Sequence, residues 1–285
     1  MEQQVSPVQA PLAYLLQLAD SALVLGQRNA EWCGHAPVLE EDIALANISL
    51  DQIGQARLLY QLAAARIQAD AALAAQHAHL QGARVDGALT EDTLAFFRDV
   101  PEFRNHTLVE LPHRGPLAST ATGDRDWATT LVRNFLYSTL MGLLWEALQH
   151  SRDADLAAIA AKSLKEVRYH VRHSRDWLVR MGDGTDQSQR RAQAALDHLL
   201  PYTREFWTPG DAESQAAANG SGVELASLQA AWDATLDAAL AEATLRRAPA
   251  EGYVPRGKHG LHSEHLGFLL AEMQSLARAH PDARW

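Results

Sequence analysis

Apolar residues recur every three or four positions along most of this chain, and this spacing is what most constrains its fold. In the stretch 39–53, apolar side chains follow the 3.6-residue period of an α-helix: Leu39, Ile43, Ala46, Leu50 and Ile53. We find no segment with the strict alternation of apolar and polar residues that is typical of a half-buried strand. The sequence therefore predicts an all-α fold.

The predicted helices cover most of the chain. We expect them at about 11–29, 37–75, 92–99, 126–151, 153–181, 188–207, 224–243 and 261–280. Several are long and the others shorter, a pattern that favours an antiparallel helical bundle with extra flanking helices. No shift in composition marks a domain boundary, so residues 1–285 are expected to form a single domain, with 1–10 disordered.

Charge and cysteine content exclude several classes of function. The net charge is -10, which argues against nucleic acid or an anionic membrane as the main partner, because both require a basic surface. The apolar run near the N-terminus is broken by Gln17 and Asp20 and reads as neither a signal peptide nor a membrane span, so we expect a cytoplasmic protein. The single cysteine, Cys33, excludes an intrachain disulfide, and we expect it to be a small buried packing residue.

A helical bundle of this length raises the question of a di-iron carboxylate site. Such a site takes a carboxylate from each of two helices and a Glu-x-x-His pair from each of two others. The three-residue spacing places carboxylate and imidazole one turn apart on the same helix face. Only Glu110 and His113 match this pair, and Pro112 lies between them in an irregular stretch. The sequence therefore lacks the two regular pairs that the site requires.

Near matches to the pattern remain on the expected helices. Gly54 stands three places after Asp51, and Tyr169 three places after Glu166, where a histidine is required. For helix 11–29 the inward candidates are Asp20 and Gln27, and the sequence does not choose between them. If the chain does bind a metal at unusual spacing, the candidate ligands are Asp51, Glu146, Glu166 and His170.

The carboxylate of Asp51 also has an explanation without metal. A buried carboxylate needs a partner. Arg57 on the same helix could supply it, as could Arg168 or Arg172 on another helix, which favours a buried ion-pair network. A second group of chemically active residues comprises His259, His262 and His265; a His-x-x-His pair can bind metal, but histidines at interfaces and caps are commoner.

Three long blocks of sequence carry a resemblance to a known family. These are "VLGQRNAEWCGHAPVLEEDIALANISLDQIGQAR", "AAKSLKEVRYHVRHSRDWLVRMGDGTD" and "GLHSEHLGFLLAEMQSLAR". In this order they closely resemble the C subunits of bacterial phenylacetyl-CoA epoxidases, which are ring 1,2-epoxidases. The resemblance extends from about residue 12 to the end of the chain, which makes it far more specific than a short motif.

The resemblance implies a ferritin-like fold and a structural function. In this family the di-iron centre lies in a separate A subunit, which also binds the CoA thioester, and the C subunit resembles it without a metal site. A small B subunit and a reductase with flavin, iron–sulfur and NADPH complete a monooxygenase that epoxidises the aromatic ring. The expected chain thus binds no cofactor and is inactive alone, although it is a component of an enzyme. The alternative is that it is itself an active di-iron subunit.

Under this resemblance, part of the surface must contact the partner subunits. Aromatic residues are enriched at such contacts. The corner before the second helix and the segment near residue 262 are the expected interface regions, with Trp32, His35, Pro37, His262 and His265 as candidates.

Overall fold

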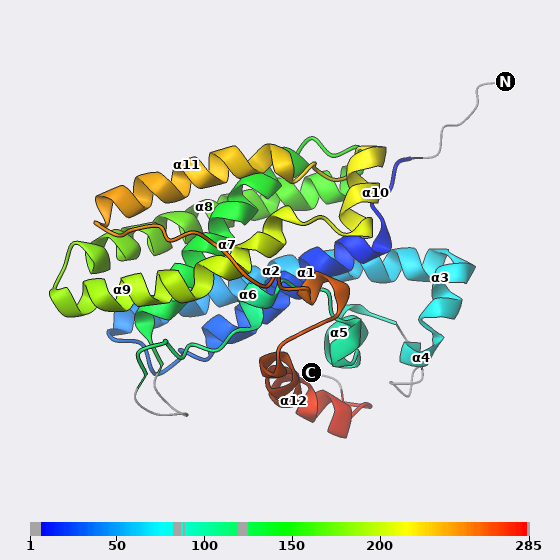
Figure 1. Cartoon of the computed structure of the whole chain (residues 1–285). Coiled ribbons are helices and arrows are strands. Elements are labelled where there is room, and N and C mark those ends of the chain that lie inside the picture. Colours follow the sequence, from blue (N-terminus) through cyan, green and yellow to red (C-terminus); the bar gives the residue numbers. More distant parts are fainter. Residues whose placement is uncertain (1–6, 82–86, 88, 119–124, 284–285) are drawn as a thin grey trace.

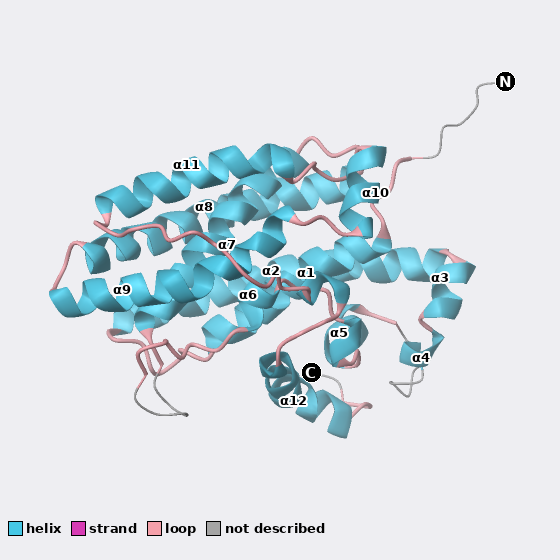
Figure 2. Cartoon of the chain, viewed as in Figure 1, coloured by secondary structure: helices cyan, strands magenta, loops and turns pink. Residues whose placement is uncertain are grey.

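The computed structural model describes residues 7–81, 87, 89–118 and 125–283. Within these ranges the chain forms helices and loops and no strand (Figure 2). The predicted all-α fold is confirmed. The α-helices are α1 Leu12–Ala30, α2 Leu39–Ala69, α3 Ala71–Gln76, α4 Ala78–Gln81, α5 Glu91–Phe96, α6 Thr107–Glu110, α7 Trp127–Leu148, α8 Ala154–Gly182, α9 Asp186–Leu199, α10 Asp211–Asn219, α11 Ala226–Glu242 and α12 Glu264–Ala279. Short 3-10 segments cover Val100–Glu102, Leu200–Trp207 and Gly257–His259.

Four long helices form the central bundle. Helix α1 packs along α2, α7 packs along α8, and α2 contacts α8 (Figure 1). Helices α9 and α11 lie against α7, while α12 contacts α5 and the end of α1. The architecture is consistent with a ferritin-like bundle that carries additional helices.

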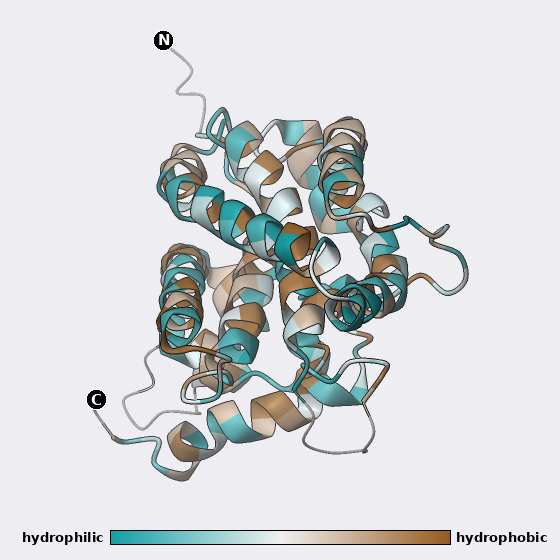
Figure 3. Ribbon diagram, turned by 90° about the vertical axis from the view of Figure 1, so that its left-hand side faces the viewer, coloured by the Kyte–Doolittle hydropathy of each residue, from teal (hydrophilic) through white to brown (hydrophobic). Residues whose placement is uncertain are grey.

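The distribution of apolar residues explains which helices are central. Helices α1 and α7 are buried on nearly all sides, whereas α8 and α9 are amphipathic and keep a polar face outside. On the outer helices, hydrophobic and hydrophilic residues accordingly lie on different sides (Figure 3). None of the described helices is both long enough and apolar enough to cross a membrane.

Several helix boundaries differ from those predicted. Helix α2 ends at Ala69 rather than 75, because Asp70 is extended and its side chain accepts hydrogen bonds from the first backbone N–H groups of α3. The helix predicted to reach 207 changes to a 3-10 segment at Leu200, followed by Pro201, which has no N–H to continue an α-helix. Helix α10 lies in a stretch where no helix was predicted and extends into the Gly- and Ser-containing segment 216–222.

The prediction of disorder for residues 1–10 is wrong for the end of this segment, next to α1. Residues 1–6 lie outside the described part of the chain. Ala10 is buried, and its backbone N–H donates to Asp153 Oδ2 at 2.7 Å. Arg66 Nη1 donates to the carbonyl of Ala10 at 3.0 Å and Arg66 Nη2 to Asp153 Oδ2 at 2.6 Å. This buried ion pair therefore fixes the segment before α1 to the start of α8.

Candidate functional site

The centre of the four-helix bundle is the place where a metal pair would lie. A cavity of only about 10 Å³ is found there between α1, α2, α7 and α8, room for at most about one water molecule. Eight residues line it, and two of them are Ala22 and Tyr137. The other six come in pairs spaced three residues apart on each of three helices: Gln52 and Gln55 on α2, Ser138 and Met141 on α7, and Val167 and His170 on α8. All six are buried.

These side chains do not fit a di-iron centre. Their spacing matches the one-turn pairs of such a site, but its iron atoms take carboxylate ligands together with imidazole. The six inward positions supply two amides, a hydroxyl, a thioether, an aliphatic side chain and one imidazole, with no carboxylate. Among the described residues, no group of three or more His, Cys, Asp or Glu side chains is placed to hold a metal ion.

The candidate carboxylates of α2 and α8 lie one position out of register with the inward residues. Asp51 and Glu166 directly precede Gln52 and Val167, and one residue turns an α-helix by about 100°. Both carboxylates therefore lie at the edge between α2 and α8. Asp51 Oδ2 is 3.0 Å from His170 Nε2, and Gln55 Nε2 donates to Glu166 Oε2 at 2.9 Å. The polar ends of the inward residues His170 and Gln55 thus turn toward the edge between α2 and α8.

The predicted arginine partners of Asp51 are also wrong. Its side chain is 36% exposed and pairs with His170. Arg57 contacts Glu91 at 3.3 Å instead, and Arg168 lies 3.9 Å from Glu146. The side chain of Glu146 is 62% exposed on α7, so the fold does not bring it together with the other three candidate ligands.

A buried ion-pair network exists, but it centres on Asp20 of α1. Asp20 and Arg98 are both fully buried and form a bidentate pair, with Nη1 3.2 Å from Oδ2. The hydroxyl of Tyr60 donates to Asp20 Oδ1 at 2.5 Å, and the backbone N–H of Arg104 donates to Oδ2 at 2.7 Å. Burial, and then the charge of Asp20, raise the pKa of Tyr60 well above its usual value. Gln27, the other candidate on α1, is only half-buried.

The single Glu-x-x-His pair of the sequence performs two separate structural tasks. Glu110 is fully buried, accepts a hydrogen bond from the backbone N–H of Ser263 at 2.5 Å and lies 2.8 Å from His262 Nδ1. Burial lowers the pKa of His262, but the hydrogen bond and charge of Glu110 outweigh it, so this pKa is raised. This contact fixes the start of α12 to α6, and it turns His262, an interface candidate, toward the inside of the chain.

The other half of the pair, His113, holds the corner before α2. Trp32 is buried, and its Nε1 lies 3.0 Å from His113 Nδ1 and 2.9 Å from Thr130 Oγ1. Burial, and then the charge of Arg133, lower the pKa of His113 well below its usual value, so the ring is neutral at pH 7. Trp32 therefore supports the corner from inside the chain and does not offer its ring to a partner.

The remaining sequence candidates lie on the surface or near it. His35 and Pro37 are exposed, and Cys33 is exposed rather than buried, contrary to our expectation. His265 is half-buried, and its backbone carbonyl accepts from Arg28 Nη2 at 3.0 Å. His259 is exposed, while His262 is bound to Glu110, so the three histidines do not form one site.

Comparison with known proteins identifies the family of this chain. The profile of a family described as "Phenylacetic acid catabolic protein" matches residues 2–285. The chain belongs to this family. A relative from Escherichia coli (strain K12), the C subunit of 1,2-phenylacetyl-CoA epoxidase, is 42% identical over 273 residues, which are 96% of this chain and 98% of the relative. The resemblance predicted from the three sequence blocks is confirmed.

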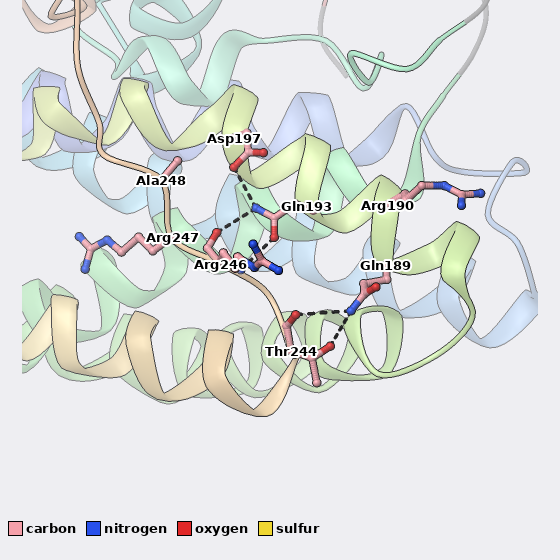
Figure 4. A pocket seen from close by; sticks show the side chains of 8 residues that line it. All are labelled: Gln189, Arg190, Gln193, Asp197, Thr244, Arg246, Arg247 and Ala248. Atoms are coloured by element: carbon pink, nitrogen blue, oxygen red, sulfur yellow. Dashed lines mark hydrogen bonds between the residues drawn. The ribbon is translucent and has the colours of Figure 1, made fainter.

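This member of the phenylacetic acid catabolic protein family also has a polar cleft of about 560 Å³ between α9 and the segment 244–248. Gln193 holds the segment there: its Oε1 accepts from the backbone N–H of Arg246 at 2.9 Å, and its Nε2 donates to the carbonyl at 2.8 Å. The side chains of Arg190, Arg246 and Arg247 point in different directions (Figure 4). Because these cations do not converge on one point, the cleft is the boundary between α9 and the segment 244–248 rather than an anion-binding site.

Proposed function

We propose that this chain is a non-catalytic structural subunit of a phenylacetyl-CoA ring 1,2-epoxidase. In this role it binds and supports a separate A subunit that carries the di-iron centre, and it acts in aerobic phenylacetate degradation. A small B subunit and an NADPH-dependent reductase with flavin and iron–sulfur are the other expected components. The name of the relative, as the C subunit of such an epoxidase, supports the assignment. We further propose that residues 1–285 act as one domain and that the complex works in the cytoplasm.

The structural part of the proposal rests on the inward positions of the bundle, which form a packed core without carboxylates. Asn29 Nδ2 donates to Gln52 Oε1 at 3.1 Å, so this amide is engaged in the fold. Val167 is 3% exposed and occupies one of the paired positions where a metal site would place a ligand. A bare carboxylate in such surroundings would be costly to bury. The four-helix frame therefore supports a role as scaffold.

Reconstitution of the epoxidase tests this role. We expect no epoxidation of phenylacetyl-CoA by this chain with the reductase and NADPH, and turnover when the A and B subunits are added. The double variant Asp51→Asn/Glu166→Gln changes both edge carboxylates to amides of similar shape. It should support turnover within about twofold of the unmodified chain when all subunits are saturating, because neither group contacts the reacting atoms.

Two results would oppose the proposal. Epoxidation by this chain and the reductase without the A subunit would show that the chain is itself catalytic. Loss of both turnover and iron in the Asp51→Asn/Glu166→Gln complex, with the subunits still assembled, would identify these carboxylates as ligands. Glu224→Gln, the same change from carboxylate to amide at an exposed position before α11, provides the matched control.

A further inference from the structure

The outer face of α2 changes character at its middle. Its first half exposes large apolar side chains: Leu39 is 72% exposed, Ile43 54% and Leu50 66%. Ile43 comes four residues after Leu39, and Leu50 comes seven residues after Ile43. These spacings place the three side chains in one stripe along the helix. The second half of the same face carries Arg57, Gln61 and Gln68, which are exposed and polar. The second half of this face is thus an ordinary solvent-exposed surface, whereas the first half exposes apolar side chains. This contrast indicates that the first half is covered by another molecule.

The chain before α2 continues this stripe. Pro37 is exposed and Val38 is 50% exposed, and both directly precede Leu39. Trp32 holds the corner from inside through its hydrogen bonds to His113 and Thr130. The apolar residues are therefore presented on a fixed support, which lowers the entropy lost on binding.

Gly54 lies at the end of the stripe and has no explanation within the chain. It is in the interior of a 31-residue helix, where glycine is less favourable than alanine. A Cβ at this position would meet no atom within 4 Å, so no packing of this chain requires glycine. A glycine on an outer helix face allows the backbone of a second element to approach closely. This absence of a Cβ is independent of the apolar stripe and points to the same partner.

Helix α8, which contacts α2, carries exposed basic side chains. Tyr169 is 39% exposed, next to the α2–α8 edge, and the Arg172 guanidinium lies 5.6 Å from the centre of its ring. Lys162, Lys165 and Arg172 are exposed, and none of them has a carboxylate partner among the described residues. Along its length α8 carries six Lys and Arg side chains against three Asp and Glu, so this helix is basic in a chain of net charge -10, whereas Glu40, Glu41 and Asp42 lie at the start of α2. An acidic partner segment would complement the α8 side of the stripe.

We propose that this surface, which we call the α2 stripe (Val38, Leu39, Ile43, Leu50 and Gly54), binds a helix of the catalytic A subunit. The partner helix crosses α2 near Gly54, and its acidic side chains face Lys165 and Arg172. The inference rests on the proposed function, because it names the surface through which that function is exercised. A second copy of this chain is the other possible occupant, and the self-association measurement below distinguishes it from the A subunit.

The Gly54 position gives a test in which stability and binding change in opposite directions. Gly54→Ala should raise the Tm of the isolated chain, because alanine favours the helix and meets open space. Gly54→Leu should leave the isolated chain folded with an unchanged or higher Tm, yet weaken its affinity for the A subunit at least about tenfold. Gln61→Leu, which adds a leucine to the polar half of the same face, is the matched control and should change affinity less than about twofold.

The charged flank gives a second, kinetic readout. Lys165→Glu/Arg172→Glu should lower the association rate constant for the A subunit by about tenfold at low salt, and the difference should shrink as salt is added. Both sets of variants are measured by biolayer interferometry against the purified A subunit, with analytical ultracentrifugation of this chain alone.

The results distinguish an error in the proposed binding surface from an error in the proposed function. If the unmodified chain binds the A subunit and Gly54→Leu binds equally well, the α2 stripe is not the interface, although the structural role stands. If the unmodified chain does not bind the A subunit at all, both the proposed function and this inference fail. Self-association of the chain alone that Gly54→Leu abolishes would assign the stripe to a second copy and overturn the inference.

Discussion

Replacing Arg98 by methionine is expected to lower the free energy of unfolding by about 3–5 kcal/mol. Arg98 and Asp20 are fully buried, and the guanidinium also lies 3.0 Å from the hydroxyl of Tyr60. Methionine fills much of the same volume but leaves the carboxylate of Asp20 without its cation in a site that water does not reach. The measurement is urea denaturation followed by circular dichroism, with the slope checked for a two-state transition.

Two matched variants separate the loss of a buried pair from the loss of any arginine. Arg57→Met removes a guanidinium whose side chain is 67% exposed, and it should cost less than about 1 kcal/mol. The double variant Asp20→Asn/Arg98→Met removes both charges and should recover part of the stability lost in Arg98→Met. If Arg98→Met were as stable as Arg57→Met, Asp20 would not depend on this partner.

Replacing Lys258 by methionine is expected to have an effect of similar size, about 3–5 kcal/mol. The side chains of Lys258 and Glu213 are 1% and 4% exposed, and Nζ lies 2.8 and 3.0 Å from the two carboxylate oxygens. Gln17 Nε2 and the backbone N–H of Gly210 also donate to this carboxylate, each at 2.7 Å. The pair therefore joins α1, α10 and the 3-10 segment before α12, and its loss leaves a buried charge.

The release of the C-terminal segment should accompany this loss. Because Lys258 fixes the chain just before α12, amide hydrogen exchange in α12 should become faster in Lys258→Met than in the unmodified chain. Lys165→Met removes an exposed lysine and is the control, with no change expected in α12. An unaltered stability and exchange pattern in Lys258→Met would show that the ion pair does not hold this segment.

The helices could be predicted from sequence because their apolar period extends over many turns. The four bundle helices were all expected close to their observed bounds, and the errors occur where a single residue decides, such as Asp70 at the end of α2. The bundle centre was harder to predict, because a shift of one residue moves a side chain by about 100° around the helix. The charge of Asp51 makes it a recognisable candidate ligand in the sequence. Gln52, which faces inward, is an uncharged amide that no sequence pattern distinguishes.

The buried ion pairs could not be predicted because their partners are distant in sequence. Asp20 and Arg98 are 78 residues apart, and Lys258 and Glu213 lie on segments with no common pattern. Only the fold brings α1 to the turn after α5, and α10 to the 3-10 segment Gly257–His259, so that these charges meet. The exposed residues of the α2 stripe had the opposite difficulty: their 3.6-residue period predicts a buried face, and the structure shows that part of this apolar pattern faces outward.

We propose that the bundle of this chain supports a metal site that lies in another subunit. Metal content, measured by inductively coupled plasma mass spectrometry, tests it most directly, on the chain purified alone and again after co-expression with the A subunit. We predict iron well below one atom per chain in the isolated protein, and about two iron atoms per pair of this chain and the A subunit in the complex. About two iron atoms per isolated chain would show that this chain holds a metal site of its own, and would make Asp51, Glu146, Glu166 and His170 the first ligands to replace.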